Sequence, residues 1–138
     1  MSGNAMNQHA KQYHLIFACS GAADVGAIAD AAARQLAKQK IVSFCCTAAI
    51  GAGISDILEK ARNAQSVSAI DGCDQNCAQR ILEQAGMPCA THLHMEEIGM
   101  EKGSSPINEK RIAIATTEMS HRLASYGIVR EFNASRLS

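Results

Sequence analysis

The sequence predicts a single three-layer α/β domain, in which a mostly parallel sheet of about four strands is flanked by helices, as in Rossmann-like and flavodoxin-like folds. Two observations predict it. Short apolar runs of strand length alternate with longer segments of helical periodicity. The chain has 138 residues, of which 47% are hydrophobic and 19% charged, and this size and composition suit one domain with its own core.

The first half of the chain contains two strand–helix units. Residues 13–19 are mostly apolar, and the Ala-rich segment 27–40 carries apolar residues at helical spacing, with Asp24 as a candidate cap. Residues 41–46 are rich in β-branched and aromatic side chains, which favours a second strand. The sequence TAAIGAG that follows predicts a loop, and the amphipathic segment 54–64 predicts a short helix.

The second half repeats this alternation. Residues 66–71 predict a third strand, followed by a turn and a helix that ends at Gly86. Residues 87–99 predict a fourth strand with an irregular exit. The last predicted helix begins near Asn108 and stops before Gly127.

Composition and charge exclude several classes of protein. Thirteen basic and thirteen acidic residues give a formal net charge of zero, and the basic residues form no dense run. A nucleic-acid partner is not expected, because phosphate binding needs a concentrated basic face. A polybasic membrane patch is not expected either. No apolar run approaches the roughly 18 residues that a membrane span requires.

The N-terminal segment is polar. Residues 1–12 lack the apolar stretch of a secretory signal, and we expect them to form a flexible tail. The single α/β domain is expected over residues 13–138. These features predict a cytoplasmic location.

Six cysteines are the chemically distinctive feature of the chain. In a reducing cytoplasm, clustered cysteines more often bind metal or act chemically than form structural disulfides. Four of them follow consecutive predicted strands, at the edge of the sheet where this fold class carries its sites: Cys19, Cys46, Cys73 and Cys77. Cys45 and Cys46 are neighbours, so in a strand they point to opposite faces. We take Cys46 as the ligand, because the strand is expected to break there, and expect Cys45 to pack under a helix.

Four thiolates at one edge predict a tetrahedral zinc site that binds the metal ion as the protein's partner. Predicted helix N-termini beside the thiols would lower the thiol pKa and favour thiolate. An iron–sulfur cluster is a less favoured alternative, since nothing in the sequence is diagnostic of one. Close approach of the backbone would be allowed by glycines in the three loops: Gly21, Gly26, Gly51, Gly53 and Gly72.

The same cysteines allow a different function. Cys19 or Cys73 could serve as the reactive thiol of a cysteine-dependent enzyme or a redox or sulfur-transfer protein, and Cys19 could pair with Cys46 in a reversible disulfide. No histidine stands near these motifs in sequence, although the fold could bring His121 to them. The loop after Cys19 does not match a low-molecular-weight phosphatase, because Val25 stands where that loop needs arginine.

Other polar residues are ambiguous in the sequence alone. Asp71 and Asp24 fit either a group that orients the thiol loops or a plain cap. Cys89, His92 and His94 allow a second metal site, but an exposed edge strand is the favoured interpretation of the two histidines.

The three cysteine blocks together resemble the DGC-domain family, whose members are described as candidate zinc-binding proteins. The resemblance rests on CSGAADVG from Cys19, CTAAIGAGI from Cys46 and AIDGCDQNCAQRILEQAG from Ala69, of which the DGCxxxC block is the most specific. The chelators proposed for the family correspond to Cys19, Cys46, Cys73 and Cys77. The resemblance does not indicate which biochemical activity the protein has. The sequence therefore predicts zinc binding, used for metal sensing, storage or delivery, with cysteine chemistry as the alternative.

Overall fold

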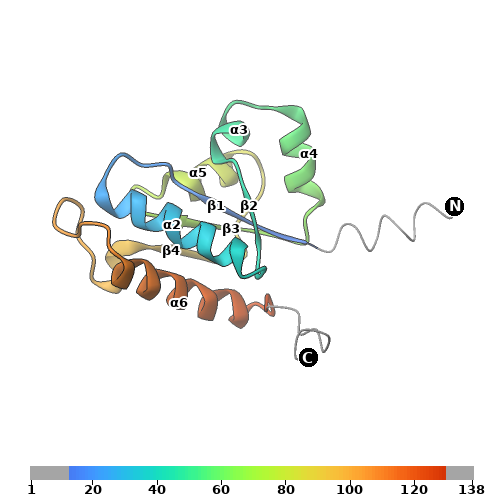
Figure 1. Ribbon diagram of the computed structural model, residues 1–138. Helices are drawn as coiled ribbons and strands as arrows, with labels where there is room; N and C mark the ends of the chain where they lie inside the picture. The colour runs from blue at the N-terminus through green and yellow to red at the C-terminus, as the bar shows by residue number, and fades with distance from the viewer. Residues whose placement is uncertain (1–12, 130–138) are drawn as a thin grey trace, which may run out of the picture.

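The protein, described over residues 13–129 by a computed structural model, contains a four-stranded parallel sheet (Figure 1). Its strands are β1 (His14–Ala18), β2 (Ser43–Cys45), β3 (Ser66–Asp71) and β4 (His92–His94). Their order in the sheet is β2-β1-β3-β4, and every neighbouring pair is parallel. The α/β fold with a parallel sheet is confirmed. The predicted tail over residues 1–12 and the chain beyond residue 129 lie outside the described residues.

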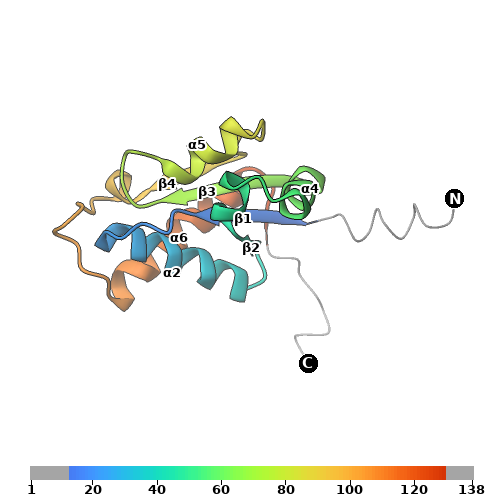
Figure 2. The same cartoon turned by 90° about the horizontal axis from the view of Figure 1, so that it is seen from above.

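Helices cover both faces of the sheet. The α-helices are α2 (Asp24–Lys38), α3 (Thr47–Gly51), α4 (Ser55–Asn63), α5 (Cys77–Gln84) and α6 (Glu109–Ser125), and β4 runs into the 3-10 helix η1 (Met95–Ile98). Figure 2 shows the sheet between α5 on one side and α2 with α6 on the other. The three predicted layers are therefore present.

The side chains of β1 alternate between two buried clusters, as the period of a strand requires. Ile16 and Ala18 pack with residues of α2 and α6, whereas Leu15 and Phe17 pack with residues of α3, α4 and α5. All four are buried. Burial on both faces explains why this strand is an almost continuous apolar run in the sequence.

Several element boundaries follow from local chemistry. The Asn108 side chain accepts a hydrogen bond from the backbone N–H of Arg111 and so caps α6 at the predicted residue. Gly86 and Gly127 both have positive φ just past a helix end, where glycine avoids the strain that other side chains meet. These ends were predicted correctly.

The segment TAAIGAG is not the predicted loop, because its first five residues form α3. Long-range contacts favour the helix there. The Thr47 hydroxyl donates a 2.7 Å hydrogen bond to the Ala18 carbonyl oxygen, and Ile50 is buried in the cluster on that face. Tertiary contacts therefore outweigh the weak local signal of a short, glycine-rich segment.

No helix within residues 13–129 is long and apolar enough to cross a membrane.

Candidate metal centre

A cleft of about 670 Å³ opens over the carboxyl ends of β1 and β3. These two strands are neighbours in the sheet, and the chain leaves β1 for β2 on one side and then crosses to β3 on the other. Such a switch point is where ligands bind in open parallel sheets. Cys19, Cys73 and Cys77 line this cleft, which we call the thiol cleft. Three of the four cysteines singled out in the sequence therefore share one cavity.

Cys46 lies beside the thiol cleft and is not part of its lining. It is exposed and directly precedes α3, whose first residues, Thr47 and Ala48, do line the cleft. The fourth thiol thus belongs to the next strand end along the sheet edge. Its position is set by α3, the helix that the sequence did not predict.

Across residues 13–129, no group of three or more cysteine, histidine, aspartate or glutamate side chains is arranged closely enough to hold a metal ion. The donor set suits zinc in kind, since it consists of thiols at the edge of one cleft. A four-cysteine site would require the thiols to draw together around the ion. Cys46, which directly precedes α3, and Cys77, the first residue of α5, are both exposed, so their side chains have room to turn.

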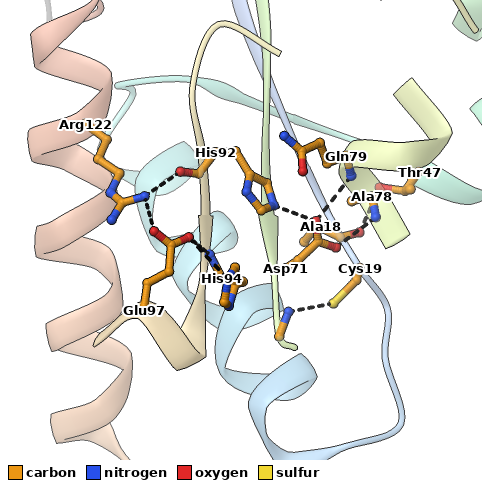
Figure 3. A network of polar contacts seen from close by, with 11 residues as sticks. Ala18, Cys19, Thr47, Asp71, Ala78, Gln79, His92, His94, Glu97 and Arg122 are labelled. Atoms are coloured by element: carbon orange, nitrogen blue, oxygen red, sulfur yellow. Dashed lines mark hydrogen bonds and ion pairs between the residues drawn. The ribbon is translucent and has the colours of Figure 1, made fainter. Parts of the chain in front are cut away.

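Cys19 is held by the turn that follows β3. Its backbone N–H donates to the Ile70 carbonyl oxygen at 3.2 Å, and its Sγ accepts the Gly72 N–H at 3.1 Å (Figure 3). Burial raises the pKa of the Cys19 thiol above its ordinary value, although the N–H groups of Gly21 and Gly72 act in the opposite direction. The sequence-based expectation of a lowered pKa is therefore wrong for this residue, because desolvation outweighs the nearby N–H donors.

Gly72, the glycine of the DGC motif, brings β3 into direct contact with the start of α2. A Cβ atom added at Gly72 would lie 2.6 Å from the backbone nitrogen of Gly26 and 2.8 Å from its Cα. A Cβ atom at Gly26 would lie 2.8 Å from the carbonyl oxygen of Gly21. Two of the five predicted close-approach glycines thus serve that purpose, and they lock the Cys19 loop against the Cys73 turn.

Asp71, the aspartate of the motif, caps α5 from outside the helix. Its carboxylate accepts hydrogen bonds from the backbone N–H groups of Ala78 at 2.8 Å and Gln79 at 3.2 Å, and it lies 2.8 Å from His92 Nε2. It is 1% exposed. Both roles considered for Asp71 are combined here, since capping the helix also fixes the helical residue Cys77.

A polar network continues from Asp71 to α6. The Arg122 guanidinium donates to the His92 carbonyl oxygen at 2.7 Å and to Glu97 Oε2 at 3.0 Å (Figure 3). Glu97 Oε1 in turn accepts the His94 N–H at 3.0 Å. The edge strand β4 is thereby fastened to both the α5 N-terminus and α6.

Cys73 and Cys77 lie on different elements. The helix α5 begins at Cys77, and Cys73 lies in the turn before it. Asn76, between them, has φ of 55°, which is the left-handed region. The reversal of the chain at Asn76 lets a turn residue and a helix residue line the same cleft.

A lysine at the thiol cleft was not anticipated from the sequence. Lys102 lies on the loop between η1 and α6 and lines the cleft. The loop is tied to the start of α2 by Asp24, whose carboxylate accepts the N–H groups of Gly103 and Ser105, both at 2.9 Å. These bonds and that of the Val25 N–H hold the pKa of Asp24 below its ordinary value. No local motif marks a contact across this sequence separation.

The remaining cysteines lie apart from the cleft lining. Cys45 is buried in the cluster beneath α3, α4 and α5, as predicted. Cys89 is partly buried against the same cluster, and desolvation raises its pKa to about 12. Neither residue has the exposure of Cys46.

The histidines are arranged differently from the sequence interpretation. His92 and His94 are partly buried and not exposed on a free edge, and their ring centroids are 6.2 Å apart. The His92 ring is paired with the Asp71 carboxylate, which explains why this histidine is partly buried. His121 is exposed on α6 and lines a separate groove with Lys110 and Glu118. Among the described residues, no histidine lines the thiol cleft.

A parallel sheet with cysteines at the carboxyl ends of its strands, and with the Asp71–Gly72–Cys73 turn built as described, defines a class of protein. The DGC domain matches residues 15–119, and the chain belongs to that family. A relative in Pseudomonas aeruginosa, the anaerobic and virulence modulator AnvM, is 28% identical over 88 residues, covering 64% of this chain and 67% of AnvM. No solved structure matches the chain.

Proposed function

We propose that the protein binds one zinc ion through Cys19, Cys46, Cys73 and Cys77. The observation that carries this proposal is the convergence of three thiols from two strand ends on one cleft, with the fourth thiol at the adjacent strand end. Four thiolates around zinc would form a closed tetrahedral site. Zinc is preferred to an iron–sulfur cluster because no residue beyond the thiols points to one.

The state of Cys19 favours a metal ligand over a free nucleophile. Burial raises the pKa of this thiol, so the metal-free protein holds little thiolate there at neutral pH. A bound cation would reverse this preference, because coordination favours the deprotonated thiol. The described lining of the cleft also holds no histidine or carboxylate that would serve as a base.

Metal sensing, storage or delivery fits the site better than catalysis or a purely structural zinc. A four-thiolate shell leaves no open position for a substrate, which argues against a catalytic zinc. The site also lies at the edge of the sheet where this class of fold binds ligands, whereas a purely structural zinc ion has no reason to lie at that edge. The relative AnvM is named a modulator. We therefore propose metal sensing, storage or delivery at a cytoplasmic location.

The test combines metal analysis with thiol titration of freshly purified protein. We expect one zinc per chain and four thiols that become reactive only after chelation. Serine at Cys46 or Cys77, both exposed, should abolish zinc retention without unfolding the chain. Serine at Cys89 is the matched control and should leave zinc in place.

A cysteine-dependent redox or sulfur-transfer activity is the second candidate. One observation favours it, since Cys19 lies in a sizeable cleft and its sulfur accepts the Gly72 N–H, which can stabilise a thiolate. Metal-free protein in which Cys19 or Cys73 reacts much faster than the other thiols would support this candidate. The same result would rule out the zinc proposal.

A further inference from the structure

The thiol cleft is larger than a metal site needs. Its volume is about 670 Å³, whereas a water molecule, similar in size to a small ion, takes roughly 30 Å³ of the liquid. Cavities of about 300–1,000 Å³ are typical of pockets for small organic molecules. Most of the cleft would therefore stay open beside a zinc ion bound at its thiols.

The walls of the cleft are predominantly apolar and small. Ala22 and Ala23 directly precede α2 and Val25 lies in its first turn, and Ala78 and Ile81 come from α5 on the opposite face of the sheet. The polar side chains of the lining are the three thiols, Lys102, Ser20, Gln75 and Thr47, and the Thr47 hydroxyl already donates to the Ala18 carbonyl oxygen. An apolar cavity with a few polar groups suits a ligand with an apolar body.

Apart from the thiols, the described lining of the cleft carries charge of one sign. Among the described lining residues, Lys102 is the one charged side chain, and no carboxylate lines the cleft. Its loop is held on both sides, since Asp24 accepts the Gly103 and Ser105 N–H groups and Ser105 Oγ accepts the Glu101 N–H at 2.8 Å. The backbone at Lys102 is thus fixed at the rim of the cleft. A cationic group in this position recognises an anion.

We propose that the thiol cleft binds a small organic anion, with its apolar body between α2 and α5 and its anionic group at Lys102. This inference goes beyond the proposed zinc binding and does not depend on it. It assigns to the cleft a ligand that would lie next to the thiols, and therefore next to the proposed zinc ion.

Two fluorescent probes that differ by one charge test the proposal. 8-Anilinonaphthalene-1-sulfonate has an apolar body and a sulfonate, and N-phenyl-1-naphthylamine is the same body without the charge. We expect one saturable site per chain for the anionic probe and about fivefold weaker binding of the neutral one, the ratio expected for one exposed ion pair. Lys102→Gln should lower the affinity of the anionic probe about fivefold and leave the neutral probe unchanged. Lys110→Gln, outside the cleft, should change neither.

A second pair of variants tests the location. Ala48→Leu fills the cleft from an exposed position and should weaken both probes at least tenfold, whereas Ala124→Leu, on the exposed face of α6, should weaken neither. Ala22→Leu is a second cleft-filling variant, to be used if α3 does not tolerate Ala48→Leu. Thermal unfolding of each variant confirms that it is folded.

Three results would overturn the proposal: equal affinities for the two probes, no effect of Lys102→Gln on the anionic probe, or unchanged probe affinity in folded Ala48→Leu and Ala22→Leu proteins. The titrations are run on metal-free and zinc-treated protein. If the protein retains zinc and neither form binds the anionic probe, this inference alone is refuted. If the protein binds the probe and does not retain zinc, the proposed metal function alone is refuted.

Discussion

Replacing Gly72 with alanine is the sharpest test of how the DGC motif builds the site. The added Cβ would lie 2.6 Å from the Gly26 nitrogen and 2.8 Å from the carbonyl carbon of Val25. These are backbone atoms, so no side chain can rotate to relieve the overlap. Gly72 does not have positive φ, and the cost is therefore steric and not conformational.

The size of the effect follows from this contact. Overpacking a well-packed site costs typically about 1–3 kcal/mol, and a clash with backbone belongs at the upper end. We expect Gly72→Ala to lower the free energy of unfolding by about 3 kcal/mol. For a domain of this size that corresponds to a melting temperature lower by roughly 12 °C. Urea and thermal unfolding measure the two quantities.

The matched control is Gly51→Ala. A Cβ there would meet the Ile81 side chain at 3.8 Å, which is ordinary van der Waals contact, and Gly51 is the last residue of α3. Alanine should stabilise the protein by about 0.4–1 kcal/mol through the unfolded state. A Gly72→Ala protein within 0.5 kcal/mol of the parent, or an equal loss in Gly51→Ala, would refute the close-packing argument.

Three further predictions follow from the polar contacts. Asp71→Ala removes the α5 cap and leaves buried N–H groups unpaired, so urea unfolding should detect a loss of about 2–4 kcal/mol; a loss below 1 kcal/mol would contradict the capping role. Asp24→Asn should speed amide exchange at Gly103, whereas the control Asp30→Asn should not. The pKa of Asp24 in the folded protein lies below its ordinary value of 3.8. In the parent protein, amide exchange at Gly103 should therefore become faster only when the pH falls through that lowered pKa. Cys89, with its pKa of about 12, should be the slowest of the partly buried thiols to react with iodoacetamide at pH 8; fast labelling there, followed by peptide mass mapping, would contradict its burial.

The sequence predicts best what depends on local pattern. The strand β3 begins and ends at the predicted residues, because a buried apolar run is bounded by a turn signal at Gly72. The cap at Asn108 and the stop at Gly127 were likewise readable from single residues. Local composition did not predict α3, because its helix depends on Thr47 and Ile50 contacting strands elsewhere in the chain.

The gathering of Cys19, Cys73 and Cys77 at one edge of the sheet was predictable, but the contacts around these residues were not. Strand order explains why Cys19 and Cys73 share a cleft, since their strands are neighbours at the switch point. The partnership of Asp71 with His92 and the approach of Lys102 arise from the loops, where spacing carries no information on contacts. The direction of the Cys19 pKa depends on burial, which a motif does not encode.

The bond from Arg122 to the His92 carbonyl oxygen has a consequence for how the molecule behaves at high concentration. β4 forms one border of the sheet, and an unpaired border is a template on which another chain can add a strand. The guanidinium occupies one of the acceptors that such an intruder would need, and the border strand itself is only three residues long. The same contact that fastens β4 to α6 therefore also protects the sheet against edge-to-edge polymerisation.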